Sequence, residues 1–353
     1  MALTKRNKIA VANIVGISMI ILALIPIIIV TVNARQTHVK QSSPSFYVIP
    51  LGTTGGLDEN NLSSYLLTSV NNNNNPSSAY IVLDGGTIRH GIEIAIQQNS
   101  LPADTDKETF IREQIKAYLI SHGHLDHNSG FILNTPNDKS GKFIIGLNET
   151  INIIRQSYFN NQAWADFGST GLKTYDYQIL DPLSTTSVPI ANTDFNVRIF
   201  RLCHTCPYLS SAFLISRRYQ PSASVLYLGD TGPDDVEKII QPDNTTYSPR
   251  YLSQLWKEMA PLVIADQLKA IFIEVSFPNE RPDHLLFGHL TPNWLLKELN
   301  VLRSYYSMKN VKIIVTHIKP EKGAREKIIE QLSNGDASYF NFIFPQQGQA
   351  IWL

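Results

Sequence analysis

The chain has 353 residues, of which 43% are hydrophobic, so it holds enough apolar side chains for the core of one large domain or two ordinary ones. Its 30 basic and 30 acidic side chains cancel, which argues against a protein that neutralises many phosphates along a nucleic acid. With only two cysteines, Cys203 and Cys206, the chain is neither a disulfide-stapled scaffold nor a four-thiolate zinc module. Any metal site must therefore use His and Asp.

The N-terminal segment differs from the rest of the chain. Residues 9–32 carry no charge and are rich in Ile, Val and Ala, so they could cross a bilayer as one helix. A retained anchor is favoured slightly over a cleaved signal peptide, and a buried core helix fits poorly because the segment is apolar on all faces. The preceding Lys5, Arg6 and Lys8 predict that the bulk of the chain faces the periplasm or the exterior.

This interpretation divides the chain into an anchor or signal segment (1–34), a polar linker (35–45) and one catalytic domain (46–353). Membrane attachment through the first segment is expected if it is not cleaved. In an oxidising compartment Cys203 and Cys206 are candidates for a disulfide, with a free pair as the equal alternative.

From Phe46 onward, short β-rich runs alternate with helical stretches, separated by Gly or Pro. The predicted strands, in chain order, are 46–50, 64–68, 80–84, 115–121, 142–146, 196–202, 211–216, 224–229, 270–274, 311–316 and 340–344. The predicted helices are 88–98, 107–113, 149–159, 251–260, 292–305 and 324–332. Residues 71–75 are all Asn and predict a flexible hairpin loop. This alternation indicates an α/β fold with two layered sheets.

The sharpest motif is Ser121-His-Gly-His-Leu-Asp-His-Asn-Ser-Gly130, directly after an apolar run. A strand ending there would deliver four polar side chains into one loop: His122, His124, Asp126 and His127. The first two can point at one cation while the other two turn toward a second. Imidazole and carboxylate ligands suit Zn²⁺, with Mn²⁺ or Fe²⁺ as other occupants. A polar turn that happens to be rich in histidine is the alternative.

One loop cannot supply all the ligands of two metals, so further ligands are expected at the ends of later strands. His204, Asp230 and His317 each follow a predicted strand. A carboxylate such as Asp230 can bridge two cations about 3.5–4 Å apart. Taken singly, each of the three also has an ordinary structural explanation: a core histidine, the first residue of a turn, or a histidine near a helix.

Together these residues resemble the metallo-β-lactamase superfamily, and the flanking sequence is similar to the class-II cyclic-nucleotide phosphodiesterases. The segments that carry the second resemblance, beside the histidine loop, are Leu51-Gly-Thr-Thr-Gly-Gly56, Leu83-Asp-Gly-Gly-Thr87, Ser210-Ser-Ala-Phe-Leu-Ile215, Ile273-Glu-Val-Ser-Phe277, Gly288-His-Leu-Thr-Pro292 and Val315-Thr-His-Ile-Lys319. The resemblance runs from about Phe46 to the last predicted strand.

The resemblance implies an αββα sandwich of two mixed sheets flanked by helices, and hydrolysis of 3′,5′-cyclic AMP or GMP to the 5′-monophosphate by a hydroxide held between two divalent ions. One ion would be held by His122, His124, His204 and Asp230. The other would be held by Asp126, His127, Asp230 and His317. A homodimer is a further expectation of the resemblance. The cysteines that flank His204 depart from the family pattern, so a metal-bound thiolate is an alternative there.

A cyclic phosphodiester is an anion that resists attack by water, so two cations would both generate hydroxide at neutral pH and offset the charge of the transition state. The departing ribose 3′-oxygen needs a proton. By resemblance to RNA-processing phosphodiesterases of the superfamily, His289 is the predicted donor and Glu274 its charge partner. A loop histidine and a structural ion pair are the alternatives. Asp126 is expected to be indispensable for turnover, and no residue is nominated for base recognition.

Two other functions compete with this one. A hydrolase of the same fold could act on another phosphodiester or a polynucleotide, although the balanced charge disfavours a nucleic-acid substrate. A membrane-tethered metal-binding protein with an inert site is the second alternative, and it would be favoured if a ligand were missing. A small cyclic nucleotide is therefore the expected partner, and the motif set rather than the fold carries this preference.

Overall fold

The computed structural model describes residues 43–220 and 222–353, and residues Pro44–Leu353 form one compact unit. Within these described ranges no helix has both the length and the apolar character needed to cross a bilayer. This finding contradicts the prediction that the chain is placed at the outer side of a membrane. The segment 9–32 and most of the proposed linker lie outside the described residues.

Two seven-stranded sheets and one two-stranded ribbon contain the strands of the described part of the chain. The first sheet has the order β16 (Ile351–Trp352), β1 (Phe46–Gly52), β2 (Ser64–Val70), β3 (Pro76–Gly85), β4 (Ile115–Leu119), β5 (Lys142–Gly146), β6 (Tyr175–Ile179). The second has the order β15 (Asn341–Ile343), β14 (Lys312–Thr316), β13 (Leu268–Glu274), β10 (Ser224–Leu228), β9 (Leu209–Arg217), β8 (Phe195–Cys203), β7 (Val188–Pro189). The ribbon pairs β11 (Ile239–Ile240) with β12 (Thr246–Tyr247).

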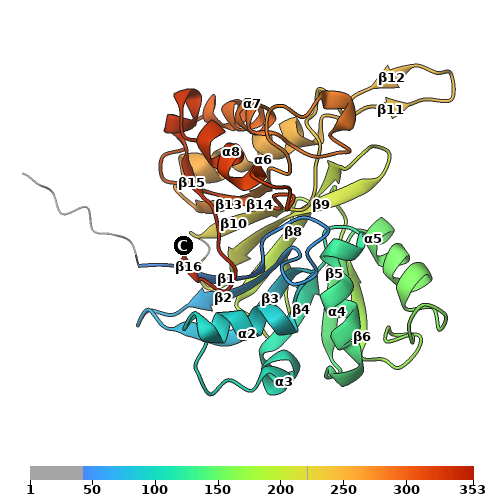
Figure 1. The fold of residues 1–353 in the computed structure, drawn as a ribbon. Coiled ribbons are helices and arrows are strands. Elements are labelled where there is room, and N and C mark those ends of the chain that lie inside the picture. Colours follow the sequence, from blue (N-terminus) through green and yellow to red (C-terminus); the bar gives the residue numbers. More distant parts are fainter. Residues whose placement is uncertain (1–42, 221) are drawn as a thin grey trace, which may run out of the picture. The chain divides into compact units, whose positions relative to one another are not determined.

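Helices cover the outer face of each sheet (Figure 1). Those on the first sheet are α2 (Arg89–Gln97), α3 (Lys107–Thr109), α4 (Ser129–Asn134) and α5 (Asn148–Ile153). Those on the second are α6 (Tyr251–Ile264), α7 (Pro292–Arg303) and α8 (Ala324–Gln331). Short 3₁₀ turns lie at Leu125–His127, Thr135–Asn137, Asp283–Leu285 and Gly335–Tyr339, and π turns at Phe110–Gln114 and Ile154–Tyr158.

Three apolar layers fill the sandwich, because the central strands bury both of their faces. In β13, Phe272 packs between the two sheets, whereas its neighbours Ile271 and Ile273 pack under α6 and α7. In β2, Leu67 faces the layer between the sheets and Leu66 the layer beneath α2. Alternate side chains of a strand point to opposite faces, so each strand serves two layers. The predicted αββα sandwich is confirmed.

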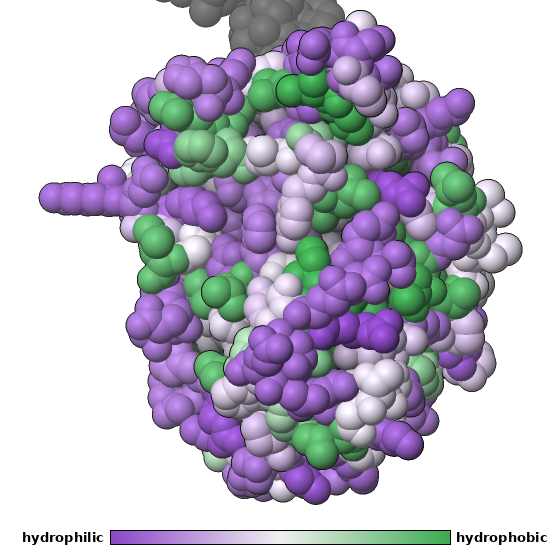
Figure 2. All heavy atoms as spheres, turned by 90° about the vertical axis from the view of Figure 1, so that its right-hand side faces the viewer, coloured by the Kyte–Doolittle hydropathy of each residue, from purple (hydrophilic) through white to green (hydrophobic). Residues whose placement is uncertain are grey.

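Polar residues dominate the outside of the unit. Figure 2 shows one face on which purple, hydrophilic residues prevail and the green, hydrophobic ones gather in separate small patches. Among the described residues, the apolar side chains lie mainly in the three internal layers.

Strand direction determines where the polar loops lie. β10, β13 and β14 run parallel, so their carboxyl ends meet at one edge of the second sheet. β8 is separated from β10 by β9, which is antiparallel to both, so β8 ends at this same edge. In the first sheet, β4 is parallel to β3 and β5 and leads into the histidine loop.

Candidate metal centre

Every predicted site residue lies at or just after the carboxyl end of a strand, or before α7. The loop after β4 holds His122, His124, Asp126 and His127, β8 leads into His204, β10 into Asp230, and β14 into His317. His317 has a φ of 58°, a left-handed conformation that turns the chain sharply out of its strand. The fold thus brings together residues from both sheets.

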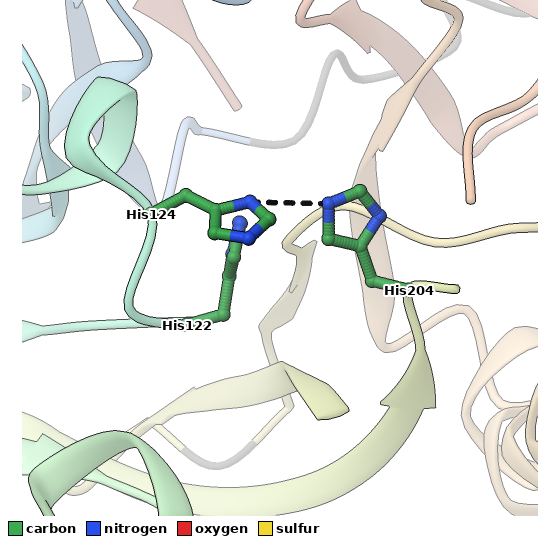
Figure 3. Close-up of side chains that lie close together, drawn as sticks. All are labelled: His122, His124 and His204. Carbon is green, nitrogen blue, oxygen red and sulfur yellow. Dashed lines mark hydrogen bonds between the residues drawn. The ribbon is translucent and has the colours of Figure 1, made fainter. Parts of the chain in front are cut away.

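The described residues form several groups of three possible ligands whose atoms lie within 4.8 Å of one another, and two of these groups divide the predicted ligands other than Asp230 between them. We name His122, His124 and His204 the first group, and Asp126, His127 and His317 the second group. Figure 3 shows the first group, in which Nδ1 of His124 faces Nε2 of His204 at 3.3 Å. In the second group, Nε2 of His317 is 3.2 Å from Oδ2 of Asp126 and 3.1 Å from Nε2 of His127.

Asp230 lies between the two groups. Its Oδ2 is 3.8 Å from Nε2 of both His122 and His204 in the first group. Toward the second group, its Oδ1 is 3.3 Å from Nε2 of His127 and its Oδ2 is 3.2 Å from Nε2 of His317. One carboxylate therefore contacts members of both groups, which is the arrangement that a ligand shared by two cations requires.

Hydrogen bonds to Asp84 orient two of the histidines. The Ser121 hydroxyl donates to Oδ2 of Asp84 at 2.7 Å, so its lone pair accepts the Nδ1–H of His122 at 3.0 Å. His127 donates its own Nδ1–H to Oδ2 of Asp84 at 2.8 Å. Tyr227 adds a third hydroxyl donor to the same oxygen at 2.6 Å. The Nδ1–H of each imidazole is therefore used in an outer hydrogen bond, and its Nε2 is directed toward Asp230.

Two further histidines are oriented in the same way. Nδ1–H of His204 donates to the carbonyl oxygen of Gly288 at 2.9 Å. The Ser276 hydroxyl donates to Oε2 of Glu274 at 2.5 Å and accepts Nδ1–H of His317 at 3.0 Å. Outer hydrogen bonds of this kind are typical of histidines that bind metals through the other ring nitrogen.

The donor set fits divalent cations. Nε2 of His122 is buried and has no hydrogen-bond partner within the described chain. Nε2 of His127 and Nε2 of His317, both lone-pair atoms when the rings are neutral, lie only 3.1 Å apart. Two lone pairs at this distance repel each other, and either a proton or a metal cation between the nitrogens removes the repulsion. Imidazole and carboxylate donors are what Zn²⁺, Mn²⁺ and Fe²⁺ accept, so the predicted divalent-metal chemistry fits the residues present.

Burial and charge act in opposite directions on these groups. Burial lowers the pKa of His122 well below its ordinary value and that of His204 to about 4, which keeps both imidazoles neutral and free to bind a cation. Burial opposes ionisation of His127 too, but the carboxylates of Asp230, Asp126 and Asp84 raise its pKa well above the ordinary value. These carboxylates therefore favour the binding of a cation at the second group.

His289 and Glu274 form a buried pair beside this cluster. Nδ1 of His289 is 2.8 Å from Oε1 of Glu274, the last residue of β13, and 3.8 Å from Oδ2 of Asp230. Burial lowers the pKa of His289, but Glu274 and then Asp230 outweigh it, so the pKa is raised overall. The structure therefore brings together the two residues that the sequence pairs as proton donor and charge partner.

Cys203 and Cys206 are joined as a disulfide, with their Cα atoms 5.2 Å apart. This is one of the two alternatives that the sequence leaves open. A disulfide offers no thiolate to a metal, and the imidazole of His204, which lies between the two cysteines in the chain, faces His124 directly.

Sequence reasoning did not find the side chains that hold the candidate ligands. Asp84 is the penultimate residue of β3 and Asp230 lies two residues after β10, and this position near the end of a strand is the signal that could have found Asp84. Asn128 donates to the carbonyl oxygens of His122 and His124 and so fixes the course of the histidine loop. Ser276 gave no signal of its own, because its histidine partner, His317, follows a different strand.

Comparison with solved structures defines the fold class. The fold is similar to that of unliganded yeast PDE1, with a TM-score of 0.73 and 21% identity over 88% of this chain and 100% of that one. It is also similar to YhfI from Bacillus subtilis, a metallo-β-lactamase fold protein, with a TM-score of 0.54 and 14% identity over 87% and 99% of the two chains. The protein thus has a metallo-β-lactamase fold.

Sequence comparison defines the family. The profile of the class-II cAMP phosphodiesterases matches residues 45–348. A protein of Yersinia pestis named "Probable 3′,5′-cyclic-nucleotide phosphodiesterase" is 36% identical over 329 residues, which cover 88% of this chain and 90% of that protein. The chain belongs to the class-II cyclic-nucleotide phosphodiesterase family, which confirms the predicted family and enzyme class. The metal-binding and catalytic roles of the individual residues stay predictions.

Proposed function

We propose that the protein hydrolyses 3′,5′-cyclic AMP, cyclic GMP or both to nucleoside 5′-monophosphates at a centre of two divalent cations. The observation that carries this proposal is the convergence of two donor groups on Asp230 in a chain of this family. The name of the Yersinia pestis relative supports the substrate class. The catalytic unit we propose is 46–353, within the compact unit Pro44–Leu353.

The first group together with Asp230 would hold one cation, and the second group together with Asp230 the other. When bound, two such cations lower the pKa of a water and offset the negative charge that develops on the phosphoryl oxygens. His124 is exposed and Asp126 is half-buried, whereas the other candidate ligands are buried. Substrate therefore approaches from the side of His124 and Asp126.

His289 supplies the proton that the leaving group needs. Its Nδ1–H donates to Glu274, which leaves Nε2 to carry the proton that passes to the ribose 3′-oxygen as the P–O3′ bond breaks. Glu274 raises the pKa of His289 and so favours the protonated form of the ring. Glu274 itself is held by the Ser276 hydroxyl and by the backbone N–H of Thr231 at 3.0 Å.

The test is a product assay on the full chain loaded with Zn²⁺ or Mn²⁺. Cyclic AMP, cyclic GMP and bis(p-nitrophenyl) phosphate are each supplied with and without a chelator. Release of the 5′-monophosphate that the chelator abolishes is the expected result. Cleavage of the generic diester alone would contradict the substrate, and hydrolysis that survives complete metal removal would contradict the metal chemistry.

Replacing the proton donor gives a second test. His289→Ala is expected to lower kcat for cyclic AMP by roughly 10²- to 10⁴-fold, the usual contribution of a general acid, and to leave the metal content unchanged. The matched control is His284→Ala, because His284 is an exposed histidine in the nearby turn Asp283–Leu285. Loss of metal from the His289 variant, or an unchanged rate, would contradict the role of proton donor.

A further inference from the structure

Lys319 lies two residues after His317 and beside the second group. Its Nζ is 3.9 Å from Oδ2 of Asp126, and 18% of its side chain is exposed. Within the described ranges of the chain it is the only Lys or Arg side chain that pairs with a candidate metal ligand, with His289 or with Glu274. Its charge is among the influences, after burial, that lower the pKa of His317.

The backbone on both sides fixes the position of Lys319. Its N–H donates to the carbonyl oxygen of Ser276 at 3.1 Å, and the carbonyl oxygen of Ile318 accepts the N–H of Gly55 at 3.1 Å. A β-carbon at Gly56 would lie 3.4 Å from Nζ, an ordinary contact distance, so the loop that contains Gly55 and Gly56 runs close beside the ammonium group. The φ of Gly56 is 66°, a conformation that favours glycine.

Pairing with Asp126 does not account for this lysine. The 3.9 Å separation is too long for a hydrogen bond, so the three N–H donors of the ammonium group are not used by Asp126. A partly exposed ion pair of this length adds little stability. The Lys319 side chain keeps 18% of its surface exposed, so a small anion from solution can reach it.

The proposed substrate is a phosphodiester anion that must come close to Asp126 and His317. We propose that Lys319 binds a non-bridging phosphoryl oxygen of the substrate and so recognises its charge. This inference rests on the proposed function, since it names the residue that holds the phosphate at the same site. A lysine suits this task because its ammonium group is a compact point charge with three donors. Lys319 is then a substrate-binding residue that takes no part in holding a cation.

The experiment compares Lys319→Met and Lys319→Arg with the wild-type full chain. Calorimetry measures binding of inorganic phosphate to the metal-loaded protein, and a parallel assay measures metal per chain. Loss of one charged hydrogen bond is expected to weaken phosphate binding roughly 10- to 100-fold in Lys319→Met, with metal content unchanged. Lys319→Arg keeps the charge and is expected to retain part of the affinity. Lys322→Met is the matched control, because Lys322 is exposed on the same loop.

Phosphate affinity equal to that of the wild type in Lys319→Met would overturn the proposal, and so would a loss of metal, because Lys319 would then act on the cation site. The calorimetric result does not depend on turnover. A chain that binds phosphate through Lys319 but cleaves no cyclic nucleotide would contradict the proposed function and leave the binding role standing. If cyclic AMP is cleaved, kcat/KM is expected to fall in Lys319→Met by the same 10- to 100-fold factor.

Discussion

The hydroxyl of Ser276 connects the second donor group with the pair of Glu274 and His289. It is completely buried, donates to Glu274 and accepts from Nδ1 of His317. A hydroxyl has one proton, so donation to Glu274 determines that His317 must be the donor in the other bond. Ser276 thereby selects the tautomer of His317 that leaves Nε2 free, and it holds the carboxylate that faces His289.

Ser276→Ala is expected to weaken binding of one of the two cations by roughly 10- to 100-fold, because His317 loses the partner that orients its ring. A Zn²⁺ titration followed by calorimetry measures the two affinities separately. Ser276→Thr keeps the hydroxyl and is expected to restore the weaker site. The matched control is Ser210→Ala, since the Ser210 hydroxyl is equally buried but has no hydrogen-bond partner in the described chain. Two unchanged affinities in Ser276→Ala would contradict the positioning role.

At the scale of elements, two carboxylates join α6 to α7. Arg250, the residue before α6, has a left-handed backbone conformation, and its side chain does not cap the helix. Asp234 caps the helix instead, because it accepts the N–H groups of Leu252 at 3.1 Å and Ser253 at 2.8 Å. Glu298 on α7 accepts the N–H of Asp234 at 3.1 Å. Burial, followed by the nearby charge of Asp234, raises the pKa of Glu298 to about 7.

Because the pKa of Glu298 is raised, the free energy of unfolding depends on pH. Between an ordinary glutamate pKa of about 4.3 and the folded value near 7, the folded state holds a proton that the unfolded state releases. The free energy of unfolding therefore falls as pH rises through this window, by roughly 2–4 kcal/mol from Glu298 alone, and is level above it. Denaturant unfolding of wild type and Glu298→Gln at pH 5 and pH 8 measures this difference.

Glu298→Gln is expected to lose less stability between pH 5 and pH 8 than the wild type, because Gln does not ionise. Glu326→Gln, on the exposed side of α8, is the control and is expected to follow the wild type. Parallel pH profiles for wild type and Glu298→Gln would show that Glu298 does not titrate in this window.

Element prediction succeeded where periodicity is strong. β5 matches its predicted bounds, 142–146, and the other predicted strands agree to within a few residues at each end. The predicted helix 107–113 divides into α3 and a π turn, and 149–159 divides similarly after α5. β6 and α4 were not predicted; β6 is an edge strand with only one buried residue, so it lacks the apolar run that marks β5.

At the scale of the whole molecule, the strand order decides which residues meet. Candidate ligands could be predicted from the sequence because each follows a strand, and parallel strands end at one edge. Their hydrogen-bond partners could not be predicted in this way. Asp84 is 43 residues from His127, and Ser276 is 41 residues from His317. Only the assembled sheets bring such pairs together, so local patterns do not show which residues pair.

The central claim is that two cations, one in each donor group, act together on a cyclic phosphodiester. The most direct test is a titration of metal-free full-length protein with Zn²⁺, with release of 5′-AMP from cyclic AMP measured at each ratio of metal to protein. The account predicts that activity rises until two equivalents are bound and is then constant. Full activity at one equivalent, or in the absence of metal, would contradict it.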